Sequence, residues 1–529
     1  MDIKTSMTHP LEIDELACGA GVVGMTLCPG KRVQSYFGGH WERNLAADMG
    51  LVADWGATAV VTLMEGFELD QLGVGNLGNV VEAVELDWHH LPIPDMQVPD
   101  ERFERRWTYT GHVLRSKLAS GERVLLHCRG GLGRTGTIAA RLAIELGAAP
   151  DAALRAVRAA RPGTVETPLQ KAYVRACRPS RADAAHAERV LGCLLGGAVG
   201  DALGYAVEFK TRREIEERYG SEGIRHPEFT RAGEAEVSDD TQMTLFTADG
   251  LLRSLGRADP VDQGTMLDAV RDATLAWYAL QTGGGLPNDR RHGLGRYTAL
   301  LTKSQAPGTT CMSACAAGAT GTPEDPINNS KGCGGVMRVA PVGLIRELTP
   351  TRAFDLAARC AAQTHGHPSG YLSAGVLAAV VSGLRGGRDL NAALADALGL
   401  AVRWSGCDET VAAIREAEAL AASHGSDHHE AIVQLGEGWV AEEALAIGLY
   451  SAMVASDFRE AVRMASNHGG DSDSTASIAG QIRGAWKGLA GIPNAWIRRL
   501  DVLETLLDVA GRLIRPQLPA GERAVIAGG

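Results

Sequence analysis

A cysteine and an arginine six positions later are the first residues whose types and spacing could do chemistry. Cys128 and Arg134 lie in the run HCRGGLGRTG, residues 127–136, between an apolar stretch and an apolar helix. A glycine-rich loop at a helix N-terminus presents backbone N–H groups and the positive end of the helix dipole to an anion. That environment favours a thiolate that can attack phosphorus, while a guanidinium can hold two phosphoryl oxygens. The glycines expected to line this anion site are Gly130, Gly131 and Gly133.

Phosphate-ester cleavage by a cysteine also needs a group that protonates the departing alcohol. The loop WHHLPIPDMQVPD, residues 88–100, supplies Asp95 for this role, with Asp87 and Asp100 as weaker competitors. An ordinary turn aspartate is the alternative interpretation of Asp95. Thr135 follows Arg134 directly and is expected to assist breakdown of the phospho-enzyme.

Two pairs of closely spaced aspartates indicate a second kind of chemistry. Asp239 and Asp240 lie in VSDDTQMT, and Asp471 and Asp473 lie in NHGGDSDSTASIAG. Neighbouring carboxylates repel each other unless a cation neutralises them, and hard oxygen ligands favour Mg²⁺, with Mn²⁺ or Ca²⁺ as alternatives. Each pair precedes an apolar helix, so a single pair is equally well explained as a helix cap. The hydroxyls beside the pairs, those of Ser238 and Ser474, would complete a set able to hold two ions.

A glycine-rich run and a histidine lie between the two acidic pairs. The run GCGGVMR, residues 332–338, allows close backbone approach to a pyrophosphate, although plain packing explains such a loop as well. His365, in THGHP, is a candidate for lining a nucleotide pocket, and a structural role is the alternative. The expected substrate-binding residues of this region are Gly334, Gly335, Arg338 and His365.

The elements that must position these residues change character near residue 183. Before it, short β-branched runs alternate with helical runs, which predicts strands over 59–64, 80–86 and 123–127 and helices over 134–146 and 152–160. After it, long runs rich in Ala and Leu predict helices over 189–199, 241–255, 352–362, 370–384, 437–455 and 496–514. We therefore expect a multidomain chain, with an α/β domain over residues 1–182 and an all-α domain over 183–529. The irregular stretches 283–289 and 306–331 are candidate lids or substrate loops.

Composition limits the functional classes. The chain has 529 residues, 45% of them hydrophobic, which predicts a folded protein of more than one domain. The 52 basic and 63 acidic residues give a net charge of -11, which disfavours a dedicated nucleic-acid binder and leaves nucleic acid only as a modified substrate. Ten scattered cysteines without a CxxC pair suit reduced thiols. No signal peptide or membrane span is evident, so we expect a cytoplasmic protein without a membrane partner.

The first constellation resembles a known family. HCxxGxxRTG, with PIPD upstream, resembles the cysteine-dependent dual-specificity phosphatases, and HCRGGLGR with HHLPIPD looks most like kinase-associated phosphatase. The resemblance covers roughly residues 15–178. It implies that Cys128 is the nucleophile, and it places Gln170 in a loop that orients the hydrolytic water.

The second constellation resembles another family. GDALGxxxE, SDDT, GCGGVMRVAP, THGHP and GGDSDS together resemble the ADP-ribosylglycohydrolases, with DALGYAVEF closest to the dinitrogenase-reductase-activating members. The resemblance covers about residues 188–515 and implies an all-α fold, two Mg²⁺ ions and cleavage of a bond to ADP-ribose. Glu208 matches the glutamate near the distal ribose, where it would ligate metal, activate water or orient the sugar. The implied metal ligands are Ser238, Asp239, Asp240, Asp471, Asp473 and Ser474, with Thr475 as an alternative to Ser474 because the family usually has Thr there.

Both constellations are complete, so the sequence predicts a bifunctional hydrolase. One activity would remove ADP-ribose from a modified acceptor, with protein arginine favoured, and the other would hydrolyse a phosphate monoester. A first alternative is processing of phosphorylated ADP-ribose or of ADP-ribosylated nucleic acid. A second alternative is a phosphatase recruited by an ADP-ribose-binding domain that does no chemistry. The expected partners are an ADP-ribosylated protein or ADP-ribose derivative and a phosphorylated substrate.

Overall fold

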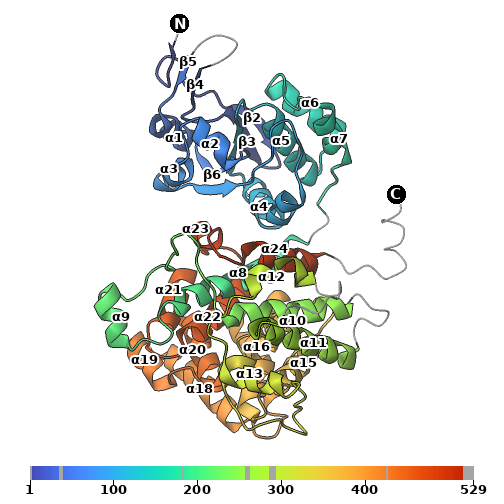
Figure 1. The fold of residues 1–529 in the computed structure, drawn as a ribbon, viewed down its shortest axis with the longest axis vertical. Helices are drawn as coiled ribbons and strands as arrows, with labels where there is room; N and C mark the ends of the chain where they lie inside the picture. Colours follow the sequence, from blue (N-terminus) through green and yellow to red (C-terminus); the bar gives the residue numbers. More distant parts are fainter. Residues whose placement is uncertain are drawn as a thin grey trace. The chain divides into compact units, whose positions relative to one another are not determined.

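The computed structural model describes residues 3–34, 40–180, 183–255, 262–284, 293–423 and 427–515. The chain divides into two compact units, Met1–Arg181 and Ala182–Gly529. The first unit mixes strands and helices, and the second is helical, so the expected fold class is confirmed (Figure 1). Within the described ranges, we find no helix with the length and apolar character needed to cross a membrane.

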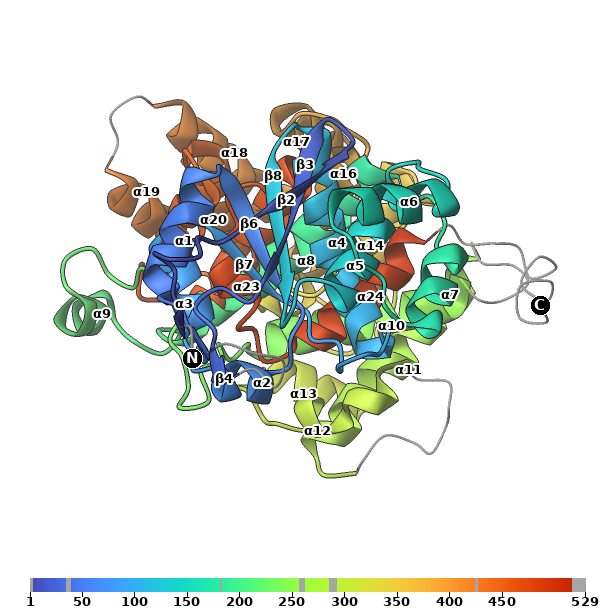
Figure 2. The same cartoon turned by 90° about the horizontal axis from the view of Figure 1, so that it is seen from above.

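A five-stranded sheet forms the centre of the first unit (Figure 2). Its strand order is β2-β3-β8-β6-β7, with β2 and β3 antiparallel and the other neighbours parallel. The central strand β8 is buried from Val124 to Cys128, as is typical of a parallel strand covered on both faces. The strands are β2 (Asp14–Cys18), β3 (Gly21–Leu27), β6 (Ala57–Thr62), β7 (Asp87–His90) and β8 (Arg123–Cys128), and β1 (Ile3–Lys4), β4 (Arg32–Gln34) and β5 (His40–Glu42) form a separate small sheet.

Seven helices complete the described part of the first unit. Helix α4 turns Phe103, Trp107, Leu114 and Leu118 into the core at helical spacing. The helices are α1 (Leu45–Asp54), α2 (Gly66–Gln71), α3 (Leu77–Ala83), α4 (Glu101–Ala119), α5 (Gly133–Glu145), α6 (Pro150–Ala160) and α7 (Pro168–Ala176).

The predicted strand over 80–86 is wrong. Residues 77–83 form helix α3, and the strand of this region, β7, begins only at Asp87. Leu77 and Val81, one helical turn apart, are buried together, and Gly78 lets the ring of Trp88 approach the helix. Tertiary packing of one helical face has outweighed the strand preference of the valines.

The second unit consists of helices and short 3₁₀ turns in its described part. Its helices are α8 (Ala184–Tyr205), α9 (Arg212–Tyr219), α10 (Asp239–Leu255), α11 (Gln263–Gln281), α12 (Thr298–Leu301), α13 (Thr309–Ala316), α14 (Ala340–Leu344), α15 (Pro350–Ala362), α16 (Pro368–Arg385), α17 (Leu390–Ala401), α18 (Asp408–Ala422), α19 (His428–Leu435), α20 (Ala441–Val454), α21 (Phe458–Ser466), α22 (Ser472–Lys487), α23 (Asn494–Ile497) and α24 (Leu503–Ile514). The 3₁₀ turns are η1 (Gly293–Tyr297) and η2 (Cys333–Gly335).

Helices α8 and α22 pack with their backbones in direct contact. A Cβ atom on Gly200 would lie 2.1 Å from the Ala476 carbonyl oxygen, and one on Gly204 would lie 2.1 Å from that of Ser472. Glycines on α8 therefore allow an approach that larger side chains would prevent. This contact brings the C-terminal end of α8 beside the N-terminal end of α22, where the acidic motifs lie (Figure 1).

Two other predictions need correction in detail. The helix predicted over 496–514 is interrupted between α23 and α24. There the Ala235 N–H donates to the Arg499 carbonyl oxygen and the Ala235 carbonyl oxygen accepts from the Asp501 N–H, a bridge that a continuous helix could not provide. The irregular stretch 306–331 contains helix α13. Of the stretch 283–289, only residues 283 and 284 lie within the described residues.

Two candidate active sites

The first site forms where β8 ends and α5 begins. Cys128 is the last residue of β8 and is 3% exposed, and its Sγ accepts a hydrogen bond of 3.3 Å from the backbone N–H of Gly131. Gly131 has a φ of +73°, and a Cβ there would lie 2.3 Å from the Thr26 carbonyl oxygen. Only glycine fits this turn, which places the Gly131 backbone N–H beside the thiol. Gly133 begins α5, while Gly130 faces open space.

Arg134 is buried beside this loop with a carboxylate partner that the sequence analysis did not identify. Its two terminal nitrogens donate to Glu68 Oε2 and Oε1 at 2.6 and 2.9 Å, and Nη1 also donates to the Ile93 carbonyl oxygen at 3.0 Å. Burial raises the pKa of Glu68, but the hydrogen bonds from Arg134 and from the Glu65 backbone N–H, together with the positive charges of Arg134 and Arg129, hold this pKa below its usual value. Glu68 thus fixes the guanidinium from one side. No motif signalled Glu68, because it lies on α2, far from the loop in sequence.

Asp95 reaches the same place from the loop after β7. Its Oδ1 lies 3.1 Å from Arg134 Nη2, and its side chain is 65% exposed, so it can meet a substrate entering from solvent. The two alternative candidates for the general acid have other partners. Asp100 caps helix α4, and Asp87 is paired with Lys117.

Thr135 and Gln170 lie next to the loop in different circumstances. The Thr135 hydroxyl is buried and has no hydrogen-bond partner among the described residues. Gln170 is buried near Gly133, where its amide accepts hydrogen bonds from the backbone of residues 166 and 167 and donates to Gln97. The Gln170 amide therefore caps α7 and ties it to the loop that follows Asp95.

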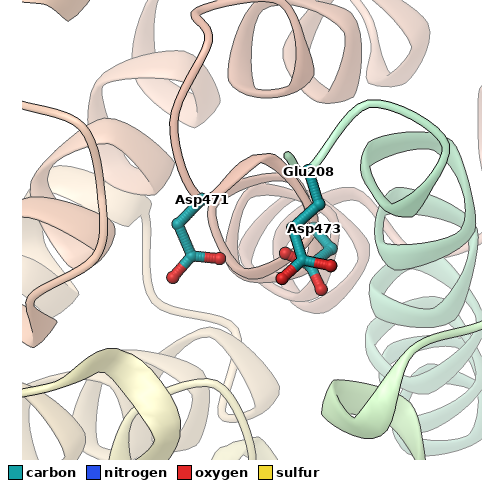
Figure 3. Close-up of side chains that lie close together, drawn as sticks. All are labelled: Glu208, Asp471 and Asp473. Atoms are coloured by element: carbon teal, nitrogen blue, oxygen red, sulfur yellow. The ribbon is translucent and has the colours of Figure 1, made fainter. Parts of the chain in front are cut away.

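The second site is a buried cluster of carboxylates. Glu208, Asp471 and Asp473 each offer an oxygen within 4.8 Å of the others, and Figure 3 shows their carboxylates turned toward one another. Glu208 follows the end of α8, whereas Asp471 and Asp473 begin α22. The cluster opens into a cavity of about 290 Å³ whose walls also include Asp239, Asp240 and Ser474.

The electrostatics of this cluster fit a cation. Burial, and then the negative charge of neighbouring carboxylates, raises the pKa of Glu208 to about 10 and that of Asp240 well above its usual value. One oxygen of each side chain, Glu208 Oε2 and Asp240 Oδ2, is buried without a hydrogen-bond donor among the described residues. Burying several neighbouring carboxylates destabilises the folded state because they repel each other. A divalent cation with oxygen ligands would offset this repulsion.

The remaining predicted ligands differ in position. Ser474 lines the cavity, and its hydroxyl is 3.4 Å from Asp240 Oδ1. Thr475 points elsewhere, since its hydroxyl donates to the Ala465 carbonyl oxygen. Ser238 is fully buried beside Asp239, and its Oγ accepts from the Asp240 backbone N–H at 3.2 Å.

Asp201 and Cys333 belong to this site but were missed from the sequence. Asp201 is fully buried in α8, and its carboxylate accepts from the backbone N–H groups of Ser238 and Thr241 at 2.9 and 3.0 Å. It thereby holds the segment that presents Asp239 and Asp240. The signal was available, because a charge inside the small and apolar segment GDALG must find partners. Cys333 lines the cavity and donates to Asp471 Oδ2 at 2.7 Å, which no charge pattern indicated.

The glycine-rich run contributes unequally to the cavity. Gly334 lines it, and a Cβ there would lie 2.6 Å from Cys311 Sγ. Gly335 packs instead against Ala361 and the Gly370 carbonyl. Arg338 is 1% exposed and lies behind the described wall, whereas His365 lines the cavity. The irregular stretch 306–331 also takes part, because the Gly308 N–H donates to Asp239 Oδ2 at 3.2 Å.

Comparison with known families agrees with both geometries. Residues 182–522 match the family model of ADP-ribosylglycohydrolase, and residues 39–148 match a model described as polymorphic toxin system, DSP-PTPase phosphatase. The first match spans more than half of the chain, so the protein belongs to the ADP-ribosylglycohydrolase family. The expected fusion of a phosphatase region with an ADP-ribosylglycohydrolase is confirmed, and the protein is a hydrolase of both types.

Individual relatives resemble one part or the other. The chain is 28% identical over 339 residues to ADP-ribosyl-[dinitrogen reductase] glycohydrolase of Rhodospirillum rubrum, covering 61% of this chain and 97% of that protein. It is 24% identical over 328 residues to ADP-ribosylarginine hydrolase Tri1 of Pseudomonas putida (strain GB-1), covering 62% and 78%. A solved structure of kinase-associated phosphatase is 25% identical, with a TM-score of 0.28 and coverage of 31% and 92%. An ADP-ribosylglycohydrolase-related protein is 27% identical, with a TM-score of 0.41 and coverage of 63% and 98%.

Proposed function

We propose that the helical unit removes ADP-ribose from a modified protein arginine and needs Mg²⁺ to do so. The observation that carries this proposal is the buried set of Glu208, Asp471 and Asp473 at the floor of the cavity. The relatives named as acting on dinitrogen reductase and on ADP-ribosylarginine support an arginine acceptor. Two ions held by Ser238, Asp239, Asp240, Asp471, Asp473 and Ser474 are part of the proposal, with Mn²⁺ as a substitute.

The chain's own residues have distinct parts in this reaction. Bound divalent cations would neutralise the carboxylates and polarise oxygens of the ribose next to the scissile bond. Glu208 faces the same space from the end of α8 and would orient the sugar. Gly334 lines the cavity, where its backbone would approach the diphosphate.

We propose further that the first unit hydrolyses a phosphate monoester through Cys128. The Gly131 N–H beside the sulfur and Arg134, held by Glu68, support binding of the phosphoryl group. Asp95, exposed and 3.1 Å from Arg134, would donate a proton to the leaving alcohol. Thr135, directly after Arg134, would assist hydrolysis of the phosphocysteine.

The test of the first activity is release of free ADP-ribose from arginine-ADP-ribosylated protein by the purified chain. Release with Mg²⁺ and none with excess chelator is the expected result. A folded protein that releases nothing with either Mg²⁺ or Mn²⁺ would refute arginine as the acceptor. Phosphorylated ADP-ribose and an ADP-ribosylated oligonucleotide, assayed in parallel, would then identify the substrate class.

A further inference from the structure

Arg338 is a buried cation without a carboxylate partner in the described part of the protein. It is 1% exposed, and its contacts are with neutral groups. Its Nη2 donates to Thr364 Oγ1 at 2.7 Å and lies 3.4 Å from the Cys360 carbonyl oxygen. The guanidinium lies behind the cavity wall, and the Thr364 hydroxyl is its shortest hydrogen-bond partner among the described residues, so Thr364 is its closest link to that wall.

The position of the Thr364 hydroxyl proton follows from its neighbours. The hydroxyl oxygen lies 2.9 Å from His365 Nδ1 and 3.3 Å from the Ala361 carbonyl oxygen. That carbonyl oxygen already accepts two backbone hydrogen bonds, from Thr364 at 3.0 Å and His365 at 2.9 Å. With Arg338 donating to the hydroxyl oxygen and the Ala361 carbonyl oxygen already accepting twice, the geometry favours donation of the hydroxyl proton to His365 Nδ1.

His365 then has its remaining proton on Nε2. Burial, and then the positive charge of Arg338, lowers the pKa of His365 to about 3, so the ring is neutral at physiological pH. Nε2 has no hydrogen-bond partner among the described residues. It borders the glycine-rich wall, because a Cβ on Gly334 would lie 3.2 Å from it. His365 is 1% exposed and lines the cavity, so an N–H at Nε2 is available to an acceptor in the cavity.

We propose that Arg338 and Thr364 are positioning residues that lock His365 as the Nε2–H tautomer, so that it donates a hydrogen bond to an oxygen of the bound ADP-ribosyl group. This inference rests on the proposed function for the identity of the ligand. The arrangement supplies the cavity with a donor that does not titrate near neutral pH. The sequence predicted that Arg338 touches the substrate. In this proposal it acts indirectly, through Thr364 and His365.

The tautomer can be read directly in the full chain labelled with ¹⁵N-histidine. Long-range ¹H–¹⁵N spectra, with His365 assigned by its loss in His365→Gln, should show Nδ1 unprotonated and Nε2 protonated from mildly acidic to mildly alkaline pH. A proton on Nδ1, or a charged ring at neutral pH, would overturn the proposal. This measurement needs neither a ligand nor a stable variant of Arg338 or Thr364.

Binding of ADP-ribose tests the consequence. Thr364→Val removes the hydroxyl at nearly constant shape, and it should release the tautomer and raise the Kd for ADP-ribose about tenfold, the value of one hydrogen bond. Thr364→Ser, which keeps the hydroxyl, should retain the wild-type tautomer and the wild-type Kd. Thr274→Val is the matched control, because the Thr274 hydroxyl is buried and, among the described residues, donates to the Val270 carbonyl oxygen of its own helix alone. An unchanged tautomer and Kd in folded Thr364→Val would refute the role.

The two proposals fail in different ways. If the wild-type chain does not bind ADP-ribose, the proposed function is wrong, while the tautomer measurement still decides whether Arg338 and Thr364 set the proton. If ADP-ribose binds equally to wild type and to a folded Thr364→Val variant with an altered tautomer, the ligand assignment for His365 is wrong.

Discussion

The charged side chains of both sites work in buried pairs and clusters. Arg134 is held by Glu68, with the two side chains 2% and 4% exposed, so the guanidinium is already oriented before a phosphate arrives. In the second unit, Asp201 performs the corresponding task by holding the backbone of Ser238 and Thr241. Groups fixed in advance lose little further freedom on binding, which is how a site achieves precise geometry.

Replacing the nucleophile separates the two chemistries. Cys128→Ser should lower phosphate release from an aryl phosphate by at least about 10³-fold, since a neutral hydroxyl is a far weaker nucleophile than a thiolate. Release of ADP-ribose should stay within twofold of wild type, which is about the error of such an assay. Parallel assays of both reactions on one preparation check this, and loss of both activities in a folded variant would contradict the assignment of two sites.

Removing one carboxylate of the cluster should have the opposite effect. Asp471→Ala deletes a group that lies within 4.8 Å of Glu208 and Asp473, and it should weaken Mg²⁺ binding at least about tenfold. ADP-ribose release should fall with it, while phosphate release is retained. Calorimetric titration with Mg²⁺ and the two assays measure these effects. If the variant bound Mg²⁺ as tightly as the wild type, Asp471 would not be a ligand and the ion would bind elsewhere.

At the scale of elements, helix packing decides whether the second site exists. Asp471 and Glu208 lie on segments that are far apart in the chain and that meet because α8 and α22 touch backbone to backbone. In the first unit, parallel β3, β6 and β8 end together and place the Cys128 loop at their carboxyl edge. The positions of the site residues therefore depend on one helix contact in the second unit and on one sheet edge in the first.

A methyl group in the α8 and α22 contact should damage stability and the site together. A Cβ on Gly200 would lie 2.1 Å from the Ala476 carbonyl oxygen, so Gly200→Ala must push the helices apart. We expect a loss of about 1 to 3 kcal/mol, as in overpacked cores, and weaker Mg²⁺ binding. Thermal unfolding and Mg²⁺ titration measure the two effects.

The matched control for this substitution lies in helix α17. Gly399 has open space at its Cβ position, and the residue is exposed. Gly399→Ala should stabilise the protein by about 0.5 to 1 kcal/mol through helix propensity alone. If Gly200→Ala behaved like this control, the close backbone contact would be wrong.

At the scale of the whole molecule, the two compact units carry separate cores and separate sites. A cation at the second site should therefore act on one unit only. The raised carboxyl pKa values give this effect a pH dependence. The pKa of Glu208 is about 10 and that of Asp201 about 7, against usual values of 4.5 and 3.8. At a pH between the usual pKa and the raised pKa of each group, the metal-free folded state binds more protons than the unfolded state.

Calorimetry of the full chain tests the sign of this linkage. Without metal, the unfolding transition of the helical unit should move to lower temperature as pH rises from about 6 to about 8. The buried carboxyl groups must bind protons when the unit folds, and protons become scarcer as pH rises. Mg²⁺ should raise that transition, and most strongly at the higher pH, where fewer protons compete for the carboxylates. The transition of the first unit should not respond. A Mg²⁺ shift in the first unit, or in neither, would contradict a metal site at the carboxylate cluster of the second unit.

The sequence by itself determined the chemistry and much of the architecture. Local patterns were enough to predict the Cys128 loop, because strand, glycine turn and helix are adjacent in the chain. The acidic pairs predicted a cation site because two pairs with neighbouring hydroxyls occur in one chain. The alternation of strands and helices before residue 183, and the long helices after it, were equally readable. The strand expected over 80–86 failed because the buried face of α3 depends on Trp88 and the sheet.

The tertiary structure alone decided which residues share a site. It joined Glu68 to Arg134, Asp201 to Ser238, and Cys333 to Asp471, and it moved Arg338 from the cavity to a position behind His365. None of these pairs is encoded by spacing, because each links segments brought together by helix packing or by a sheet edge. Sequence patterns report neighbours along the chain, whereas burial and hydrogen bonding depend on neighbours in space.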